Sequence, residues 1–103
     1  MPPATQKESR SWMFLTSHAL VLLAIAADPD RRVEDIAGQV GITTRQALNI
    51  LRDLEDGGYL RRTRTGRRSR YTLSAERPFR HPSIANHNVA ELLAIFSDQY
   101  KER

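Results

Sequence analysis

Cysteine is absent from the 103 residues. This absence excludes disulfide bonds, thiol redox chemistry and cysteine-based metal sites. It agrees with a reducing compartment, and we expect a cytoplasmic protein. Hydrophobic residues make up 40% of the chain and charged residues 27%, so a single folded domain is expected rather than a disordered chain.

Groupings of residues that carry catalysis are also lacking. The three histidines are His18, His81 and His87, and no two of them lie at the spacing of metal ligands on a helix. No Ser/His/Asp grouping and no glycine-rich phosphate loop is found. We therefore expect no metal site, no cofactor and no enzyme activity.

No apolar run is long enough to cross a membrane. The longest, ALVLLAIAA at 19–27, has nine residues, whereas a spanning helix needs about 20. Residues 24–26 resemble a signal-peptidase site, but polar Thr16, Ser17 and His18 interrupt the apolar stretch. The run instead predicts a buried helix over residues 11–27, capped by Ser9 or Ser11 and ended by the turn at 28–30. Residues 1–10 are expected to be a flexible tail.

Acidic residues are scarce in one part of the chain. Residues 61–80 contain eight arginines and one acid, a net charge of +7, whereas the rest of the chain carries −3. The stretch RRTRTGRRSR at 61–70 holds six of those arginines. Positive charge concentrated in this way indicates a polyanionic partner.

Two helices joined by a short turn precede the basic stretch. The first is indicated by apolar residues on one face, Ile36, Ala37 and Val40. Gly41 ends it at a position that suits a left-handed backbone. Thr43 begins the second, with Gln46 completing a T-x-x-Q capping box. Its inner face is expected to comprise Ala47, Ile50, Leu51 and Leu54.

A hairpin and a last helix follow. Residues 59–65 and 69–73 alternate as strands around Gly66, with Tyr71 and Leu73 on one face and Arg70 and Thr72 on the other. The pattern predicts that the arginines occupy the face opposite the apolar residues. After a proline-containing loop at 76–87, Asn88 is expected to cap a final helix at 88–103.

This order of elements resembles the winged helix-turn-helix transcriptional regulators of the MarR/ArsR-like group. The resemblance is carried by VEDIAGQVGITTRQALNILR and LRDLEDGGYLRRTRTGRRSRYTLS and covers about residues 11–75. It implies a mostly helical fold with a small β-hairpin wing, flanked by N- and C-terminal helices. It also implies a recognition helix at 43–52 and a wing at 61–70, both binding double-stranded DNA.

The chemistry of each candidate side chain suggests which part of the DNA it would contact. Arg45 suits guanine, whereas Gln46 and Asn49 suit adenine. Thr43 or Thr44 and Arg52 are expected to contact phosphates. Leu48 is open between the edge of the core and a thymine-methyl contact. The wing arginines are expected to hold phosphates or enter the minor groove, and they are Arg62, Arg64, Arg67, Arg68 and Arg70.

Dimerisation through the terminal helices is the habit of the resembled family. The expected homodimer interface comprises Trp12, Leu15, Ala19, Leu22, Val89, Leu92, Leu93, Phe96 and Tyr100. An unidentified small-molecule effector is an open question, and Trp12, Phe14 and Leu15 could line its pocket. Two other functions stay open: a winged helix that binds proteins, and nonspecific nucleic-acid binding in an architectural role.

Overall fold

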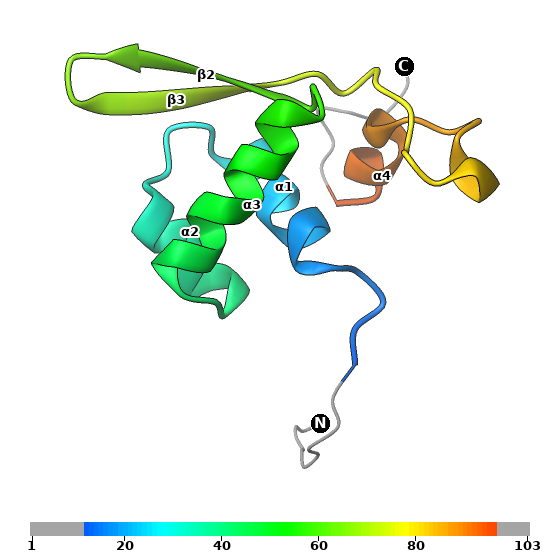
Figure 1. The fold of residues 1–103 in the computed structure, drawn as a ribbon, viewed down its shortest axis with the longest axis horizontal. Coiled ribbons are helices and arrows are strands. Elements are labelled where there is room, and N and C mark those ends of the chain that lie inside the picture. Colours follow the sequence, from blue (N-terminus) through cyan, green and yellow to red (C-terminus); the bar gives the residue numbers. More distant parts are fainter. Residues whose placement is uncertain (1–11, 97–103) are drawn as a thin grey trace.

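A computed structural model describes residues 12–96, which form a mostly helical body with one β-hairpin projecting from it (Figure 1). Within that range the elements are α1 (Ser17–Ala27), α2 (Val33–Val40), α3 (Thr44–Asp56), β2 (Leu60–Thr65), β3 (Arg68–Leu73), a 3₁₀ turn (Pro82–Ile84) and α4 (Val89–Phe96). No helix of the described part is long and apolar enough to cross a membrane. The expected tail at 1–10 and the end of the last helix lie outside the described residues.

Helix α1 begins later than the sequence predicted. Its cap is Thr16, whose hydroxyl oxygen accepts a hydrogen bond from the Ala19 amide at 3.2 Å. The predicted start at residue 11 is wrong, because residues 12–16 are not helical. Trp12 and Phe14 pack edge to face on each other at 5.2 Å instead and are 75% and 93% exposed. A threonine oxygen close to the apolar run therefore set the boundary.

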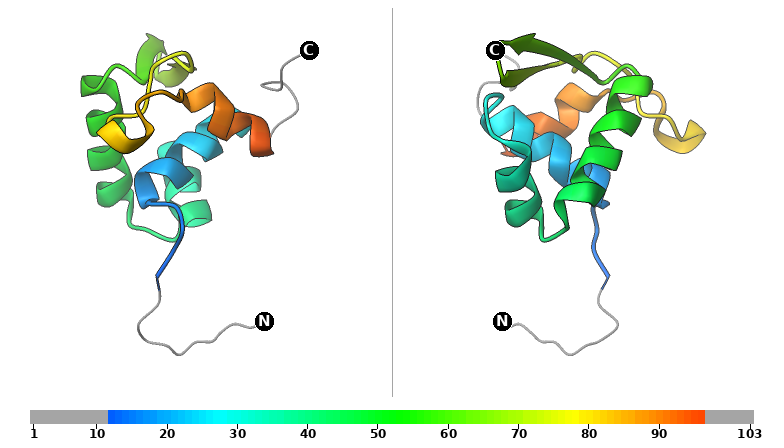
Figure 2. Two further views of the ribbon diagram at one scale, coloured as in Figure 1. Left: turned by 90° about the vertical axis from the view of Figure 1, so that its right-hand side faces the viewer. Right: turned by 60° about the vertical axis from the view of Figure 1, so that its left-hand side comes forward.

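Helix α1 is apolar on most sides because the chain itself covers it on most sides. It packs against α2, α3 and α4 (Figure 2), and Val21 and Ile25 are fully buried. Helix α4 covers one of these sides. Leu93 of α4 is fully buried against this core.

The turn between α2 and α3 follows the sequence signals. Gly41 ends α2 with a φ of 87°, in the left-handed region where glycine carries no penalty. Thr43 caps α3, and its capping box is complete: Thr43 Oγ1 accepts from the Gln46 amide at 3.0 Å, and Gln46 Oε1 accepts from the Thr43 amide at 2.8 Å. The predicted boundary of this helix is thus confirmed.

The hairpin differs from its prediction in which face carries the arginines. The antiparallel register pairs Arg62 with Tyr71 and Arg64 with Ser69. Cross-strand partners share a face, so these two arginines lie on the same face as the buried Leu60 and Tyr71. Residues on the opposite face are Arg61, Thr63, Thr65, Arg68, Arg70 and Thr72. The expected separation of basic from apolar residues therefore holds for Arg61, Arg68 and Arg70 and is wrong for Arg62 and Arg64.

The segment after the hairpin returns to the body and closes the fold. Arg77 donates to the Gly57 carbonyl at 3.0 Å, at the C-terminal end of α3, where a cation is favoured by the helix dipole. Asn88 and Glu91 form the expected cap of α4, with Glu91 N donating to Asn88 Oδ1 at 3.1 Å and Asn88 N donating to Glu91 Oε2 at 3.0 Å. A hydrogen bond from His87 to Glu91 holds the pKa of that carboxyl below its ordinary value.

A substitution at Gly58 tests how the segment after the hairpin packs against the C-terminal end of α3. Its φ is +86°, and a Cβ there would meet Arg77 Nη2 at 2.8 Å. Gly58→Ala should therefore destabilise the fold by about 1–2 kcal/mol from the backbone alone. Gly38→Ala is the matched control, because Gly38 sits inside α2 with open space around it, and alanine there should stabilise by about 0.5–1 kcal/mol. Chemical denaturation measures both, and equal effects of the two changes would contradict the assignment.

Candidate nucleic-acid interface

Helix α3 presents a polar stripe to solvent. Arg45, Asn49 and Arg52 are all exposed and lie at i, i+4 and i+7, so they share one face. The opposite face is buried through Ala47, Ile50, Leu51 and Leu54, as expected. Within the described residues no ion pair occupies Arg45 or Arg52. The helix therefore offers two free guanidinium groups and one amide along its exposed side.

The first turn of α3 is partly used by its own cap. Gln46 Oε1 is bonded to the Thr43 amide, so the two-point contact with adenine expected of Gln46 would compete with the capping box. The Thr43 oxygen likewise accepts from Gln46, but its hydroxyl hydrogen is still available. Thr44 is exposed at the first helical position. This end suits an anion, and the best-placed side chains for reading bases are Arg45 and Asn49.

The base of the hairpin rests on α3. Arg62 Nε lies 3.6 Å from Glu55 Oε2, and the carboxylate partly neutralises this arginine. Arg62 is also the cross-strand partner of Tyr71; burial raises the pKa of Tyr71, while the positive charge of the neighbouring guanidinium opposes that rise. Arg62 thus joins the two elements and is a weaker candidate for a phosphate contact than the sequence indicated.

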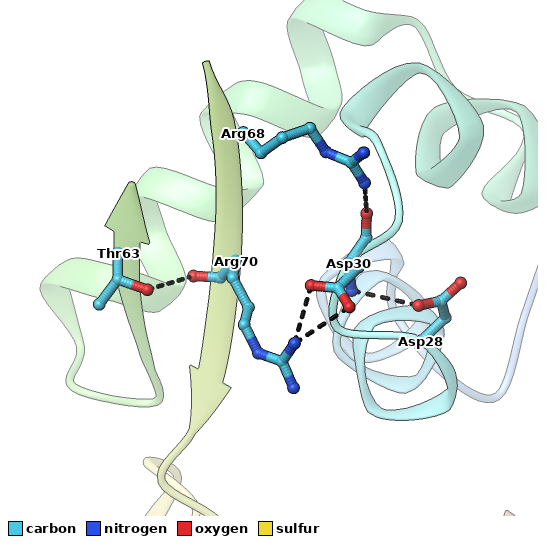
Figure 3. Close-up of polar contacts among 5 residues, drawn as sticks. All are labelled: Asp28, Asp30, Thr63, Arg68 and Arg70. Carbon is cyan, nitrogen blue, oxygen red and sulfur yellow. Dashed lines mark hydrogen bonds and ion pairs between the residues drawn. The ribbon is translucent and has the colours of Figure 1, made fainter. Parts of the chain in front are cut away.

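Two further arginines of the hairpin are engaged with the loop between α1 and α2. Arg70 Nη1 donates to both carboxylate oxygens of Asp30 at 3.0 Å, and Arg68 Nη2 donates to the Asp30 carbonyl at 3.1 Å (Figure 3). The sequence separates these partners by 38 to 40 residues. Sequence reasoning assigned both arginines to DNA and did not identify Asp30.

Three arginines of the hairpin make neither an ion pair nor a side-chain hydrogen bond within residues 12–96. Arg61 and Arg64 are exposed along β2, and Arg67 is exposed at the turn beside Gly66. The turn projects well beyond the helical body (Figure 1). These side chains can therefore reach a partner that the body itself does not touch.

A basic cleft connects the hairpin with the helices. It measures about 380 Å³. Leu48, which is 44% exposed, lines it together with Tyr71. Five arginines line it against two acids, Asp30 and Glu34; they are Arg31, Arg32, Arg62, Arg67 and Arg68. Sequence reasoning missed Arg31 and Arg32, because nearby acids balance them along the chain, whereas the fold turns them toward the hairpin.

The residues expected at a dimer interface are divided by the fold. Leu22, Val89 and Leu93 are buried in the chain's own core, so in this form they offer no surface to a second subunit. Leu15, Ala19 and Leu92 are half-buried. Trp12 and Phe96 are exposed, and Tyr100 lies outside the described residues. A homodimer stays a prediction. Within the described residues, the expected interface residues that still expose surface are Trp12, Leu15, Ala19, Leu92 and Phe96.

An apolar cavity lies among α1, α2 and α4, lined by Leu20, Leu23, Val40 and Phe96 among others. Trp12 and Phe14, which could have lined an effector pocket, are exposed. Residues 12–96 contain no group of three or more His, Asp or Glu side chains that could hold a metal ion.

No protein-family model matches this chain, and no curated protein matches its sequence. Function must therefore be inferred from the site itself. The arrangement combines an exposed polar helix, a basic cleft and a projecting hairpin whose free arginines outnumber its acids. Chemically it can bind an extended anion through several guanidinium groups at once.

Proposed function

We propose that the protein is a transcriptional regulator that binds double-stranded DNA in a sequence-specific manner, as a winged helix-turn-helix of the MarR/ArsR-like kind. Helix α3 acts as the recognition helix in the major groove. The hairpin acts as the wing on the backbone or in the minor groove. The observation that carries the proposal is that the exposed stripe of α3 adjoins the basic cleft and the free arginines of the hairpin.

The size and charge of this surface fit a duplex. A major groove is about 12 Å wide and admits one α-helix. Helix α3 has 13 residues, and its exposed side carries cations without neutralising acids up to Arg52. Further on, Asp53 and Asp56 would repel phosphates, so contact is expected along the N-terminal two-thirds of the helix. The cleft and the hairpin continue the positive surface beside it.

Specificity is assigned to two side chains of α3. Arg45 can donate two hydrogen bonds to guanine, and Asn49 can pair with adenine through both its amide groups. They are one helical turn apart, which matches reading of neighbouring base pairs. Arg52, Arg64 and Arg67 are assigned to phosphates. Nonspecific binding would use the arginines alone.

A homodimer is part of the proposal. Its support is the apolar surface left exposed at the two ends of the described chain, where Trp12 is 75% and Phe96 60% exposed. Two copies would then read two half-sites about 34–36 Å apart. The same exposed residues would also serve a protein-binding module, and this second candidate function predicts a folded protein without affinity for DNA.

Selection from a pool of randomised duplexes tests the function directly. At about 0.15 M salt, a specific regulator should enrich one motif, and a dimer should enrich an inverted repeat. Binding to the enriched duplex should then weaken as salt rises, with log K falling by about 0.9 per phosphate neutralised. Salt-dependent binding without an enriched motif would leave only the nonspecific role. No binding at low salt would reject DNA as the partner.

Arg45→Ala tests the reading role. It should lose discrimination at one base position of the enriched motif, by about 1–3 kcal/mol. Arg80→Ala removes the same charge near Gly57, at the other end of α3, and should leave every position unchanged. A repeated selection with each variant makes the comparison. Equal weakening on all sequences by Arg45→Ala would show that this residue holds a phosphate instead.

A further inference from the structure

The loop between α1 and α2 is hydrogen-bonded to strand β3 of the hairpin. The Asp30 carboxylate accepts hydrogen bonds from Arg70, and the Asp30 carbonyl accepts one from Arg68. The Tyr71 amide donates to the Pro29 carbonyl at 3.3 Å. Asp30 is itself held in place, because its amide donates to Asp28 Oδ1 at 3.1 Å (Figure 3). We call this set of contacts, made by residues 28–30 with residues 68–71, the clasp.

The clasp is one of few attachments of the hairpin to the body. A two-stranded hairpin is only marginally stable by itself. Its apolar face rests on α3 near Leu60 and Tyr71, but its outer half has no apolar support. Within the described residues the clasp supplies the hydrogen bonds that join β3 to the loop before α2. We expect these bonds to hold the angle between the hairpin and α3.

The clasp also neutralises a cation that could otherwise bind DNA. Arg70 is 60% exposed at its side chain and Asp30 51% exposed, so the pair is reached by solvent and by a large ligand. A single exposed ion pair is weak. Here, however, the backbone that carries the carboxylate is held by the bond from the Asp30 amide to Asp28 and by the bond from the Tyr71 amide to Pro29. Arg70 therefore keeps a local partner that a phosphate would have to displace.

We propose that Asp30 is a positioning residue that determines specificity: it withholds Arg70 from the nucleic acid and fixes the hairpin at the angle that lets α3 read bases. This inference rests on the proposed function. Nonspecific affinity grows with each phosphate neutralised, whatever the sequence. A regulator gains discrimination when its hairpin contributes few such contacts, and the clasp leaves Arg61, Arg64 and Arg67 as the free arginines of the hairpin.

Asp30→Asn is the decisive variant, because it removes the charge and keeps the size of the side chain. Released Arg70 should add one phosphate contact. Binding to a scrambled duplex should tighten several-fold at low salt, and the slope of log K against log salt should steepen by about 0.9. Arg68 should stay in place, because its partner is the backbone carbonyl of residue 30. The ratio of affinities for the selected and scrambled duplexes should fall.

Asp35→Asn is the matched control. Asp35 is an exposed acid in the first turn of α2, and within residues 12–96 its side chain makes no hydrogen bond or ion pair. The same loss of charge occurs close to the clasp, so a general electrostatic effect would appear in both variants. The slope of Asp35→Asn should stay within about 0.3 of the parent protein. Equal slopes for the two variants would overturn the role of Asp30.

Amide hydrogen exchange tests the positioning without DNA. In Asp30→Asn the Tyr71 amide and its neighbours in β3 should exchange faster, whereas the amides of α1 should not change. Unchanged exchange in β3 would overturn the positioning part of the proposal. If the parent protein binds no duplex at low salt, the proposed function fails and the specificity role falls with it. Binding by the parent with an unchanged slope in Asp30→Asn overturns the role of Asp30 alone.

Discussion

Replacing Arg64 and Arg67 together with alanine should weaken DNA binding by about 10–100-fold at 0.1 M salt, and equally on every sequence. Both side chains are exposed near the end of the hairpin, without an ion pair in residues 12–96. Two lost phosphate contacts should flatten the slope of log K against log salt by about 1.8. Fluorescence anisotropy with a labelled duplex, at four or more salt concentrations, measures both effects.

The double lysine variant is the control for this experiment. Arg64→Lys with Arg67→Lys keeps both charges, so the salt slope should remain that of the parent protein. Lysine loses the planar two-point contacts of arginine. A drop in affinity at constant slope would therefore indicate contacts beyond charge, such as insertion into a narrow minor groove. A slope unchanged by the alanine variant would mean that this end of the hairpin does not touch DNA.

Truncating Leu93 to alanine should destabilise the protein by about 2–5 kcal/mol, the usual cost of a cavity at a buried leucine. Leu93 is 0% exposed and packs in the core shared by α1 and α4. A domain of this size has a total stability of about 5–15 kcal/mol, so much of the margin would be lost. Urea denaturation followed by circular dichroism measures the change. A loss below about 1 kcal/mol would contradict the packing of α4 on α1.

Phe96→Ala separates folding from association. Phe96 lies on the same helix, and its side chain is 60% exposed, so truncation should cost little stability in a monomer. If α4 contributes to a homodimer, this variant should dissociate at concentrations where the parent protein is dimeric, as read by light scattering. If the variant keeps the oligomeric state of the parent protein, the interface does not include the end of α4. Leu93 cannot serve this test, because changing it disturbs the fold itself.

Several local features were predictable from the sequence, because the signals lie within a few residues of one another. The capping box of Thr43 and Gln46 starts α3, Gly41 ends α2, and Asn88 with Glu91 caps α4. Each involves a side chain and an amide three residues apart or a backbone angle that favours glycine. The inner face of α3 followed equally from helical periodicity.

Other features were mispredicted where several local solutions compete. More than one Ser or Thr could cap α1, and the choice of Thr16 leaves Trp12 and Phe14 outside the helix. The face of Arg62 depends on how β2 and β3 pair, and one shift of register reverses every side chain. For the candidate interface, the sequence pointed to Arg64 and Arg67, which are free, but equally to Arg62, Arg68 and Arg70, which are engaged. It did not single out Arg61.

The sequence by itself determined the order of the elements, the caps of α3 and α4, the turn after α2 and the concentration of positive charge after α3, because these depend on neighbouring residues. Only the tertiary structure decided which arginines remain free. Arg70 meets Asp30 across 40 residues of chain, and Arg31 and Arg32 join Arg62 in one cleft. These contacts depend on how the helices and the hairpin pack. Packing brings together charged residues that are far apart in the sequence, so no local sequence pattern predicts them.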